Sequence, residues 1–444
     1  MGGHWIFCIA LACAALGTGQ NPSGPLITVG QKPGEHGLTA EQKRLNIQSF
    51  EFIWSTIRDQ YWDPSFGGVN WIGVHDELGP ELERAVTMQQ AREVMGQMMG
   101  RLGKSHFAII PNDVYGDVDA GSGEGRGSGT AGLDVRVLDE HALVTTIERS
   151  SPAAAQGVHA GWEILAIDGA ELAPLLRRLS ALYHDSTARE LYLARAVMAK
   201  LAGEAGRTVR VQFLDGADVR VTKRIERIQP QGSLAHFGYL PPMHVWIKSR
   251  KVADNIGYVA FNLFLDPARL MPEFGDAVHS CADCAGVIID LRGNPGGLGI
   301  MAMGMAGWFI EKPDQRLGTM HTRQAPLKFT VNPRLPTYRG PLAILVDGSS
   351  GSTSEVFAGG MKDLGRARIF GTRTAGAALP SAIDRLPNGD AFQHALADYI
   401  SEGGQPLEGV GVAPDVEVRL TRAALLAGRD PVLDAAIEWI HSRK

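Results

Sequence analysis

The spacing of hydrophobic and polar residues divides the chain into a helical first part and a mixed second part. Over residues 40–104, apolar side chains recur at steps of three and four, which is typical of amphipathic helices. One such stripe is formed by Ile47, Phe50, Ile53, Trp54 and Ile57. A second, in TMQQAREVMGQMMGRLG, ends at Gly103, a residue type that often terminates helices. We therefore predict an N-terminal helical domain over residues 41–114.

A different pattern follows. Residues 115–131 are rich in glycine and serine and predict a linker, because no strand and helix flank them as a phosphate-binding loop requires. Residues 132–169 hold two alternating runs, a short helix (SPAAAQ) and a further strand (WEILAIDG). Helical sequence at about 174–205 precedes another strand pair, so we expect a β-rich domain over 132–232 with a helical insertion.

Buried-type strands then alternate with helices to the end of the chain. AGVIIDLRG and PLAILVDG are strand-like, and SEVFAGGMKDLG is helix-like. This alternation predicts an α/β layered core over residues 233–444.

Composition narrows the class of protein. The chain has 444 residues, enough for two or three domains, and a net charge of −5 without any Lys/Arg-rich run. We therefore expect no nucleic acid and no anionic membrane surface among its partners.

The first 20 residues have an apolar centre from Trp5 to Leu16. That is too short for a bilayer, which needs about 20 residues, and indicates a secretory signal peptide followed by a flexible lead-in over 21–40, although the n-region lacks Lys and Arg. Lipid attachment at Cys13 is the alternative. No later segment is a transmembrane candidate, so we predict a periplasmic or extracellular protein.

Cys281 and Cys284 form a C-x-x-C that precedes a strand, whereas a redox motif would follow one. A small disulfide and two plain thiols both remain open. No H-E-x-x-H occurs in the sequence, and we expect no metal or other cofactor.

Two glycine-rich turns carry the candidate chemistry. GVIIDLRGNPGG and LVDGSSGSTSE each join a strand to a helix, where backbone N–H groups are exposed and the helix dipole adds positive charge. An acyl-transfer transition state needs two such donors. Gly296, Gly297 and the start of the second helix could form that oxyanion hole. On spacing alone Ser350, Ser352 and Ser354 are equal as nucleophiles, and all could simply cap the helix.

The same two segments, together with TRTAG, resemble the serine-peptidase family of carboxyl-terminal processing peptidases and the tricorn core protease. SPAAAQGVHAGWEILAIDG is similar to their PDZ-like domain, and FIWSTIRDQYWDP with LGKSHFAIIP resembles their N-terminal helices. The resemblance implies a crotonase-like α/β peptidase core. It also implies that the nucleophile is Ser352, three residues before Glu355, and that the oxyanion donors are the N–H groups of Gly297 and Thr353.

The general base separates two branches of the family. One branch uses a lysine, but the matching position here is Ala377, and no lysine occurs between Lys362 and Lys444. Lys362 lies ten residues after Ser352 on the predicted helix, roughly 15 Å along it, and is therefore too far from Ser352 to act as its base.

The tricorn-like branch uses histidine, which is the usual base near neutral pH. By resemblance, His106 would be the base, with Ser105 and Glu408 in a supporting polar network. Glu408 could instead recognise a substrate amino terminus or brace its loop. His394 is the main rival base. Asp290 and Arg292 are expected to form a structural ion pair, and Asp363, Arg366 and Arg373 are also expected to be structural.

The segment AGLDV, with Gly132 and Leu133, resembles the loop by which PDZ domains hold a peptide carboxylate, with the peptide added along a strand edge. We therefore assign Gly132 and Leu133 to substrate binding. Gly296 is assigned to substrate binding as well, because a glycine in its turn lets a substrate backbone come close. The helical insertion departs from a plain PDZ domain.

The favoured function is a secreted serine endopeptidase acting on polypeptides without a cofactor. The alternatives are a catalytically silent binding or carrier protein on the same fold, and an acyl-thioester enzyme using the oxyanion hole.

Overall fold

The computed structural model describes residues 37–112, 128–253 and 255–443. The predicted signal peptide, Cys13, most of the lead-in and most of the glycine-rich linker lie outside these ranges. Within them, no helix is both long enough and apolar enough to cross a membrane.

The N-terminal helical domain contains three helices. They are α1 (Ala40–Gln60), α2 (Trp71–Arg84) and α3 (Met88–Gly100), with a short 3-10 turn, η1 (Phe66–Gly68). Thr39, Asn70 and Thr87 each cap a helix by accepting a backbone N–H, as polar N-cap residues do. The predicted stripe faces inward at Phe50, Ile53 and Ile57, but Ile47 is 40% exposed.

The β-rich module begins at residue 128. Its main sheet has the order β3-β4-β5-β8-β9, which leaves β3 at an edge. The insertion forms two helices, α6 and α7, and α7 packs against β3. The elements are β2 (Ser128–Gly129), β3 (Leu133–Leu138), β4 (His141–Ile147), α5 (Pro152–Ala155), β5 (Glu163–Ile167), β6 (Ala170–Glu171), α6 (Leu172–Leu182), α7 (Arg189–Leu201), β7 (Gly203–Glu204), β8 (Thr208–Leu214) and β9 (Arg220–Glu226).

The C-terminal core is built on a six-stranded sheet of order β12-β13-β14-β17-β18-β22. Its strands are β12 (Ile247–Val252), β13 (Ile256–Phe261), β14 (Gly286–Asp290), β17 (Leu342–Val346), β18 (Arg368–Gly371) and β22 (Val416–Glu417). All neighbours are parallel except β12 and β13. Because β14 and β17 are parallel neighbours, the loops that follow them emerge at the same edge of the sheet.

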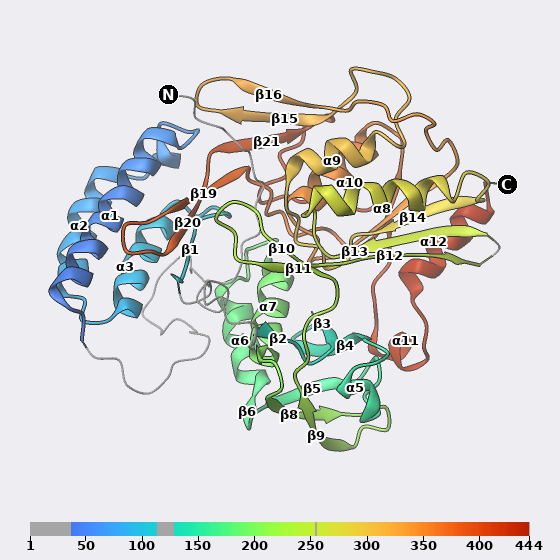
Figure 1. Cartoon of the computed structure of the whole chain (residues 1–444), viewed down its shortest axis with the longest axis horizontal. Helices are drawn as coiled ribbons and strands as arrows, with labels where there is room; N and C mark the ends of the chain where they lie inside the picture. The colour runs from blue at the N-terminus through green and yellow to red at the C-terminus, as the bar shows by residue number, and fades with distance from the viewer. Residues whose placement is uncertain (1–36, 113–127, 254, 444) are drawn as a thin grey trace.

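Helices cover both faces of this sheet (Figure 1). Residues of α8 (Pro267–His279), α9 (Gly299–Ala306) and α10 (Thr353–Asp363) share one hydrophobic cluster with one face. Residues of α12 (Pro431–His441) pack on the other face. The predicted α/β layering is therefore observed, and a disulfide joins Cys281 to Cys284 in the turn between α8 and β14.

Several strands beyond the main sheet were not predicted from the sequence. They are β10 (Ser233–Ala235), β11 (Met243–Val245), β15 (Arg316–Thr322), β16 (Pro326–Thr330), β19 (Ser381–Arg385), β20 (Ala391–Ala395) and β21 (Ala397–Ser401). The last helix before α12 is α11 (Arg422–Leu426), which meets the β-rich module through hydrogen bonds from Arg422 to Gly161 and Asp215.

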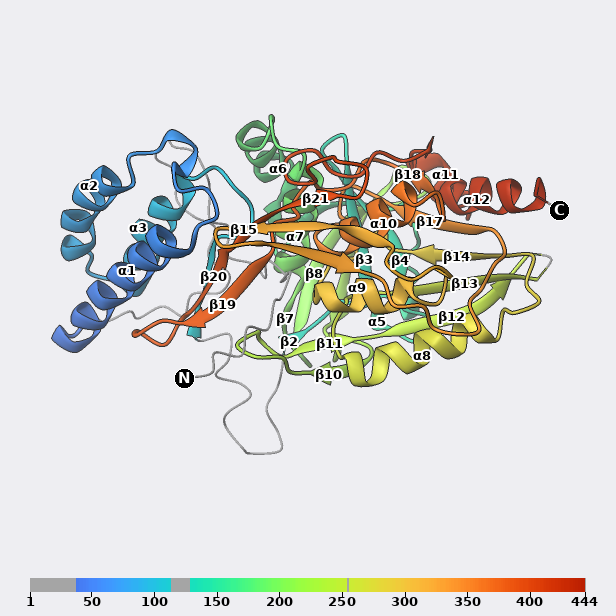
Figure 2. The same ribbon diagram turned by 90° about the horizontal axis from the view of Figure 1, so that it is seen from above.

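The β19–β20 hairpin extends away from the core to the N-terminal helices (Figures 1 and 2). Strand β20 pairs with β1 (Ala108–Ile110), which follows the helical domain in the chain. Phe392 and Leu386 of the hairpin belong to the same hydrophobic cluster as the helices. The hairpin is thus part of the core of the helical domain.

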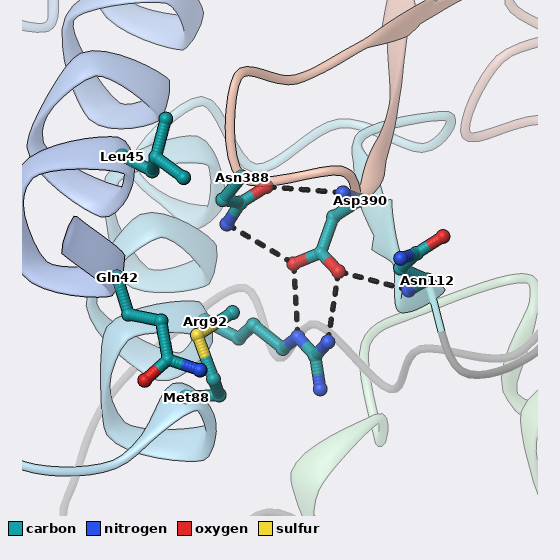
Figure 3. Close-up of a pocket in the computed structure, with 7 residues that line it drawn as sticks. All are labelled: Gln42, Leu45, Met88, Arg92, Asn112, Asn388 and Asp390. Atoms are coloured by element: carbon teal, nitrogen blue, oxygen red, sulfur yellow. Dashed lines mark hydrogen bonds and ion pairs between the residues drawn. The ribbon is translucent and has the colours of Figure 1, made fainter. Parts of the chain in front are cut away.

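A buried ion pair holds the hairpin turn in place (Figure 3). Arg92 of α3 donates two hydrogen bonds to the fully buried carboxylate of Asp390, at 2.8 and 2.9 Å. The same carboxylate accepts the N–H of Asn112 and the amide of Asn388. Asn388 also bonds to Asn46 of α1, so this polar pocket ties the hairpin turn to α1, to α3 and to the segment that follows β1.

Candidate active site

The β17–α10 loop, residues 347–352, singles out one serine by geometry. Ser350 donates its hydroxyl to the carbonyl of Leu291, and Ser354 donates to that of Asn294, so both hydroxyls serve the fold. Ser352 is the N-cap of α10, and its φ of 55° and ψ of −118° are a conformation that favours glycine. The hydroxyl of Ser352 faces His106.

His106 lies between α3 and β1, and it too has a positive φ, of 63°. Its Nε2 atom is 3.3 Å from Ser352 Oγ, in a contact buried from solvent. Nε2 can therefore accept the Ser352 proton. The structure brings together two residues separated by 246 positions in the sequence.

Ser105 and Glu408 extend this contact into a polar chain. The Ser105 hydroxyl is 2.6 Å from His106 Nδ1 and 2.8 Å from Glu408 Oε2. A carboxylate can only accept, so the Ser105 O–H donates to Glu408 and its oxygen is left to accept from Nδ1. That arrangement leaves Nε2 unprotonated and directed at Ser352.

The Glu408 carboxylate is held by three donors. Its Oε1 accepts the N–H of Ser105, and Oε2 accepts both the Ser105 hydroxyl and the N–H of Ala378. Burial raises the pKa of Glu408, against these hydrogen bonds, which lower it. The fixed carboxylate orients Ser105 and, through it, the imidazole.

The β14–α9 loop lies directly beside Ser352. A Cβ atom at Gly296 would meet Ser352 Cβ at 2.6 Å and the backbone nitrogen of Thr353 at 2.7 Å, so only glycine fits. Within the described part of the chain, the N–H groups of Gly297 and Thr353 donate to no backbone acceptor. Two donors are thus available next to the serine, as an oxyanion requires.

Two protein families match segments of this chain. The family described as "Peptidase family S41" matches residues 255–418, which contain both glycine-rich loops. The family described as "Tricorn protease C1 domain" matches residues 46–100 in the helical domain. The chain is a serine-type peptidase of family S41.

Relatives of this peptidase are named either as carboxyl-terminal-processing peptidases or as tricorn protease homologs. It is 26% identical over 378 residues to the chloroplastic carboxyl-terminal-processing peptidase 3 of Arabidopsis thaliana, covering 82% of this chain and 67% of that protein. It is 25% identical over 425 residues to the carboxyl-terminal-processing protease of Synechocystis, covering 94% and 91%. It is 27% identical over 417 residues to tricorn protease homolog 1 of Streptomyces coelicolor, covering 88% of this chain but 34% of that one.

Solved structures share the fold of the peptidase. The photosystem II D1 C-terminal processing protease matches with a TM-score of 0.56 and 22% identity, over 86% of this chain and 94% of that one. Mature CPAF matches with a TM-score of 0.60 and 15% identity, over 90% and 97%. The mixed α/β fold of S41 peptidases is therefore the fold of this chain.

Rival residues in the peptidase have other partners. The Lys362 ammonium bonds to the carbonyl of Ala413 and pairs with Asp415 at 3.1 Å. The Nε2 atom of His394 bonds to Asp384, and its ring stacks on Phe392. Among the described residues, neither side chain forms a hydrogen bond or an ion pair with Ser352.

The remaining polar residues of the two motifs support the loops. Arg292 pairs with both Asp290 and Asp430, linking the end of β14 to α12. Asp363 accepts the N–H of Gly403. Arg366 and Arg373 donate to backbone carbonyls.

In the sequence, Glu355 serves only to identify Ser352 as the nucleophile, but in the structure its side chain lies at the centre of the site. Its side chain is fully buried, and its two oxygens accept four hydrogen bonds, from Ser352, Thr374, Gly376 and Ala377. Burial raises the pKa of Glu355 to about 7, against those hydrogen bonds. Its place three residues after the serine was the available signal.

A contact between the β-rich module and the β17–α10 loop was also missed. Arg136 of β3 donates to Asp347 at 2.6 Å, and Asp347 also accepts the N–H groups of Gly293 and Ser349. Burial alone would raise the pKa of Asp347, but Arg136 and the N–H of Gly293 hold it below its usual value. The module therefore touches the loop that carries the serine.

The predicted carboxylate-binding residues lie elsewhere in the module. Gly132 and Leu133 stand at the start of β3, where the Gly132 carbonyl accepts the N–H of Glu148. The Gly132 N–H points to Thr130 Oγ1 at 3.3 Å. Among the described residues, neither Gly132 nor Leu133 forms a hydrogen bond with Ser352, whereas Gly296 lies so close to Ser352 that a Cβ there would clash with it.

Proposed function

We propose that the chain is a serine endopeptidase that cleaves polypeptides through an acyl-enzyme, with Ser352 as nucleophile and His106 as general base. The observation that carries this proposal is the continuous chain from Ser352 Oγ through His106 and Ser105 to Glu408. This arrangement supports the histidine-dependent branch of the family over the lysine-dependent one, because Ala377 occupies the lysine position and its N–H and C=O serve the loop.

The geometry suggests the following course of reaction. Ser352 Oγ attacks the peptide carbonyl carbon while its proton passes to His106 Nε2. The N–H groups of Gly297 and Thr353 bind the oxygen that becomes negative. The imidazolium, held through Ser105 by the Glu408 carboxylate, then protonates the leaving amine as the C–N bond breaks. Water, deprotonated by the same imidazole, hydrolyses the acyl-enzyme and restores Ser352.

The β-rich module is proposed to be PDZ-like and to recruit polypeptide along β3, within a crotonase-like peptidase architecture. Strand β3 is an edge strand, which can accept an added peptide strand. However, the N–H of Val135 bonds to Asp134 Oδ1, and its carbonyl accepts from Arg136. A peptide pairing with Val135 must therefore displace these two side chains.

We also propose that the protein works outside the cytoplasm, in the periplasm or beyond the cell. The apolar segment at residues 1–20 motivates this proposal, and the Cys281–Cys284 disulfide is consistent with an oxidising compartment. N-terminal sequencing of the protein recovered from its native cell tests it. A chain that retains residues 1–20 and stays in the cytoplasm would contradict secretion.

The first test of the catalytic proposal is intact-mass analysis after incubation with a fluorophosphonate. We expect one adduct on the parent protein and none on Ser352→Ala or His106→Ala. Ser350→Ala is the matched control, since its hydroxyl lies in the same loop but bonds to Leu291, and it should label. A folded parent that takes no adduct would refute an active peptidase and leave the silent binding protein.

A further inference from the structure

The four catalytic candidates do not determine which backbone N–H groups bind the oxyanion. In an acyl-transfer site, the N–H of the nucleophilic residue itself can serve the oxyanion. Here the N–H of Ser352 is turned away, toward Glu355 Oε2 at 2.9 Å and the carbonyl of Ala377 at 2.9 Å. Something must hold the peptide plane in that orientation.

The carboxylate of Glu355 does so from two sides. Oε2 binds the N–H of Ser352 and of Ala377, whereas Oε1 binds the Thr374 hydroxyl and the N–H of Gly376. These four donors come from two segments, the start of α10 and residues 374–377. The carboxylate therefore fastens the strained Ser352 to a loop that Gly409 and Val412 also bind, next to Glu408.

The hydroxyl of Thr353 makes the second attachment. It donates to the carbonyl of Gly297 at 2.8 Å, across the gap between the two glycine-rich loops. This bond fixes the distance between the two residues whose N–H groups donate to no backbone acceptor among the described residues. Gly297 itself has a φ of 142°, and a Cβ there would lie 2.2 Å from the Phe264 carbonyl, so its position is closely constrained.

We propose that Glu355 and Thr353 are positioning residues. Together they form a clamp that determines which backbone N–H groups bind the oxyanion in this peptidase. Glu355 binds the Ser352 N–H and so turns the Thr353 N–H toward the substrate, while the Thr353 hydroxyl holds the Gly297 N–H beside it. The clamp deepens the proposed acyl-enzyme function and rests on it. Neither side chain contacts the reacting atoms.

The chemistry of the carboxylate explains why glutamine is an imperfect replacement. All four neighbours are donors, so an amide must direct its NH₂ group at two of them. One pair includes the Ser352 N–H, and the other includes the N–H of Gly376. In either orientation the segment that carries Ser352 loses a fixed acceptor or shifts relative to residues 374–377.

The test compares Glu355→Gln and Thr353→Val with the parent protein, using a peptide substrate, a fluorophosphonate and a peptide boronate. The boronate forms a tetrahedral adduct and therefore reports on the oxyanion hole. In both variants we expect kcat to fall at least tenfold, KM to stay within twofold, and the boronate to bind at least tenfold more weakly. A residue with a purely structural role would not shift boronate binding in parallel with kcat.

Asp430→Asn is the matched control. Asp430 also accepts several hydrogen bonds, from Arg292 and from the N–H of Leu433, but it caps α12 away from Ser352. We expect it to lower the melting temperature and leave kcat within twofold. The proposal is overturned if folded Glu355→Gln behaves as Asp430→Asn does. Should Glu355→Gln fail to fold, parent-like kcat and boronate binding in Thr353→Val overturn it.

The parent protein separates failure of the clamp from failure of the proposed function. A parent that reacts with neither fluorophosphonate nor boronate contradicts the acyl-enzyme proposal, and the clamp with it. A reactive parent with equally reactive variants contradicts the clamp alone.

Discussion

The Nε2 atom of His106 lies 3.3 Å from Ser352 Oγ, although one residue precedes the β-rich module and the other follows it by more than a hundred positions. The contact depends on two anchored segments. His106 is fixed by Ser105 and by β1, which pairs with β20, and Ser352 is fixed by Glu355. Both residues have positive φ angles, a conformation that surrounding contacts must enforce.

Removing the Ser105 hydroxyl should weaken the base. In Ser105→Ala, His106 Nδ1 loses its hydrogen bond with the Ser105 hydroxyl, and Glu408 loses one of its three donors. We expect kcat to fall by about 100-fold, the lower end of what general base catalysis contributes. Steady-state kinetics measures this, and Ser105→Thr, which keeps a hydroxyl, should recover most of the rate. Equal rates in the parent and Ser105→Ala would argue against the relay.

Replacing Glu408 by glutamine should affect the same relay from its far end. The amide NH₂ would face either the Ser105 N–H or the Ser105 O–H and Ala378 N–H. We expect a fall in kcat of roughly 100-fold or more, as for other neutralised triad carboxylates. Glu402→Gln, whose carboxylate pairs with Arg316 instead, is the control and should be near parent. A parent-like Glu408→Gln would place Glu408 outside the relay.

The buried Glu355 predicts a pH dependence of stability. Its pKa rises from an ordinary 4.5 to about 7 on folding, so between these pH values the folded state binds more protons than the unfolded state. The free energy of unfolding should therefore fall as pH rises through this window, by an amount on the order of 3 kcal/mol from this group. Glu408, whose pKa is also raised, acts in the same direction.

Urea unfolding of the parent and Glu355→Gln from pH 4.5 to 7.5 measures this dependence. The glutamine variant should show a flatter profile, because only the Glu408 contribution and those of minor groups remain. A variant profile as steep as that of the parent would mean that Glu355 is ionised throughout the range.

The ion pair between Arg92 and Asp390 should hold the helical domain to the core. Asp390→Asn removes the buried carboxylate that pairs with the Arg92 guanidinium. Breaking a fully buried pair typically costs about 3–5 kcal/mol, and the partial exposure of Arg92 should bring the loss toward the lower end of that range. We expect denaturant unfolding to show this loss and limited proteolysis to open residues 37–112 first. Glu77→Gln, which removes an exposed pair with Arg101, should change stability by less than about 1 kcal/mol. Similar values for both variants would contradict the role of the pair.

Gly296→Ala should abolish catalysis. The new Cβ would lie 2.6 Å from Ser352 Cβ and 2.7 Å from the Thr353 nitrogen, so one of the two loops must shift. We expect no fluorophosphonate adduct and no measurable turnover. Gly404→Ala is the control, because Gly404 also has a positive φ but has open space around it. An adduct on Gly296→Ala at the parent rate would show that the loops tolerate the shift.

Local pattern was sufficient to predict several parts of the fold. The stripe containing Phe50 and Ile53 predicted a helix, and the apolar runs before Gly293 and Gly348 predicted two buried strands that each lead through a glycine-rich turn into a helix. That these strands are parallel neighbours, which brings the two turns together, is seen only in the structure. The serine could not be chosen by spacing, because the contacts that distinguish the three serines form only on folding: the hydroxyls of Ser350 and Ser354 bind backbone carbonyls, whereas that of Ser352 faces His106.

Other features depend on contacts that no local pattern encodes. The β19–β20 hairpin has ordinary strand sequence, and nothing in it indicates that Phe392 joins the core of a distant helical domain. Arg136 sits in an alternating strand, and its pairing with Asp347 arises only from the docking of the module. Glu355 reads as an ordinary first-turn acid, and its four donors come from two segments.

The joining of β1 to β20 has a consequence for biosynthesis. His106 is translated before the hairpin that completes the domain around it, and before Ser352 and Glu408. A growing polypeptide on the ribosome therefore cannot assemble the proposed relay until Glu408 has been made. If the proposed mechanism holds, the order of synthesis keeps the unfinished chain inactive toward itself and its neighbours.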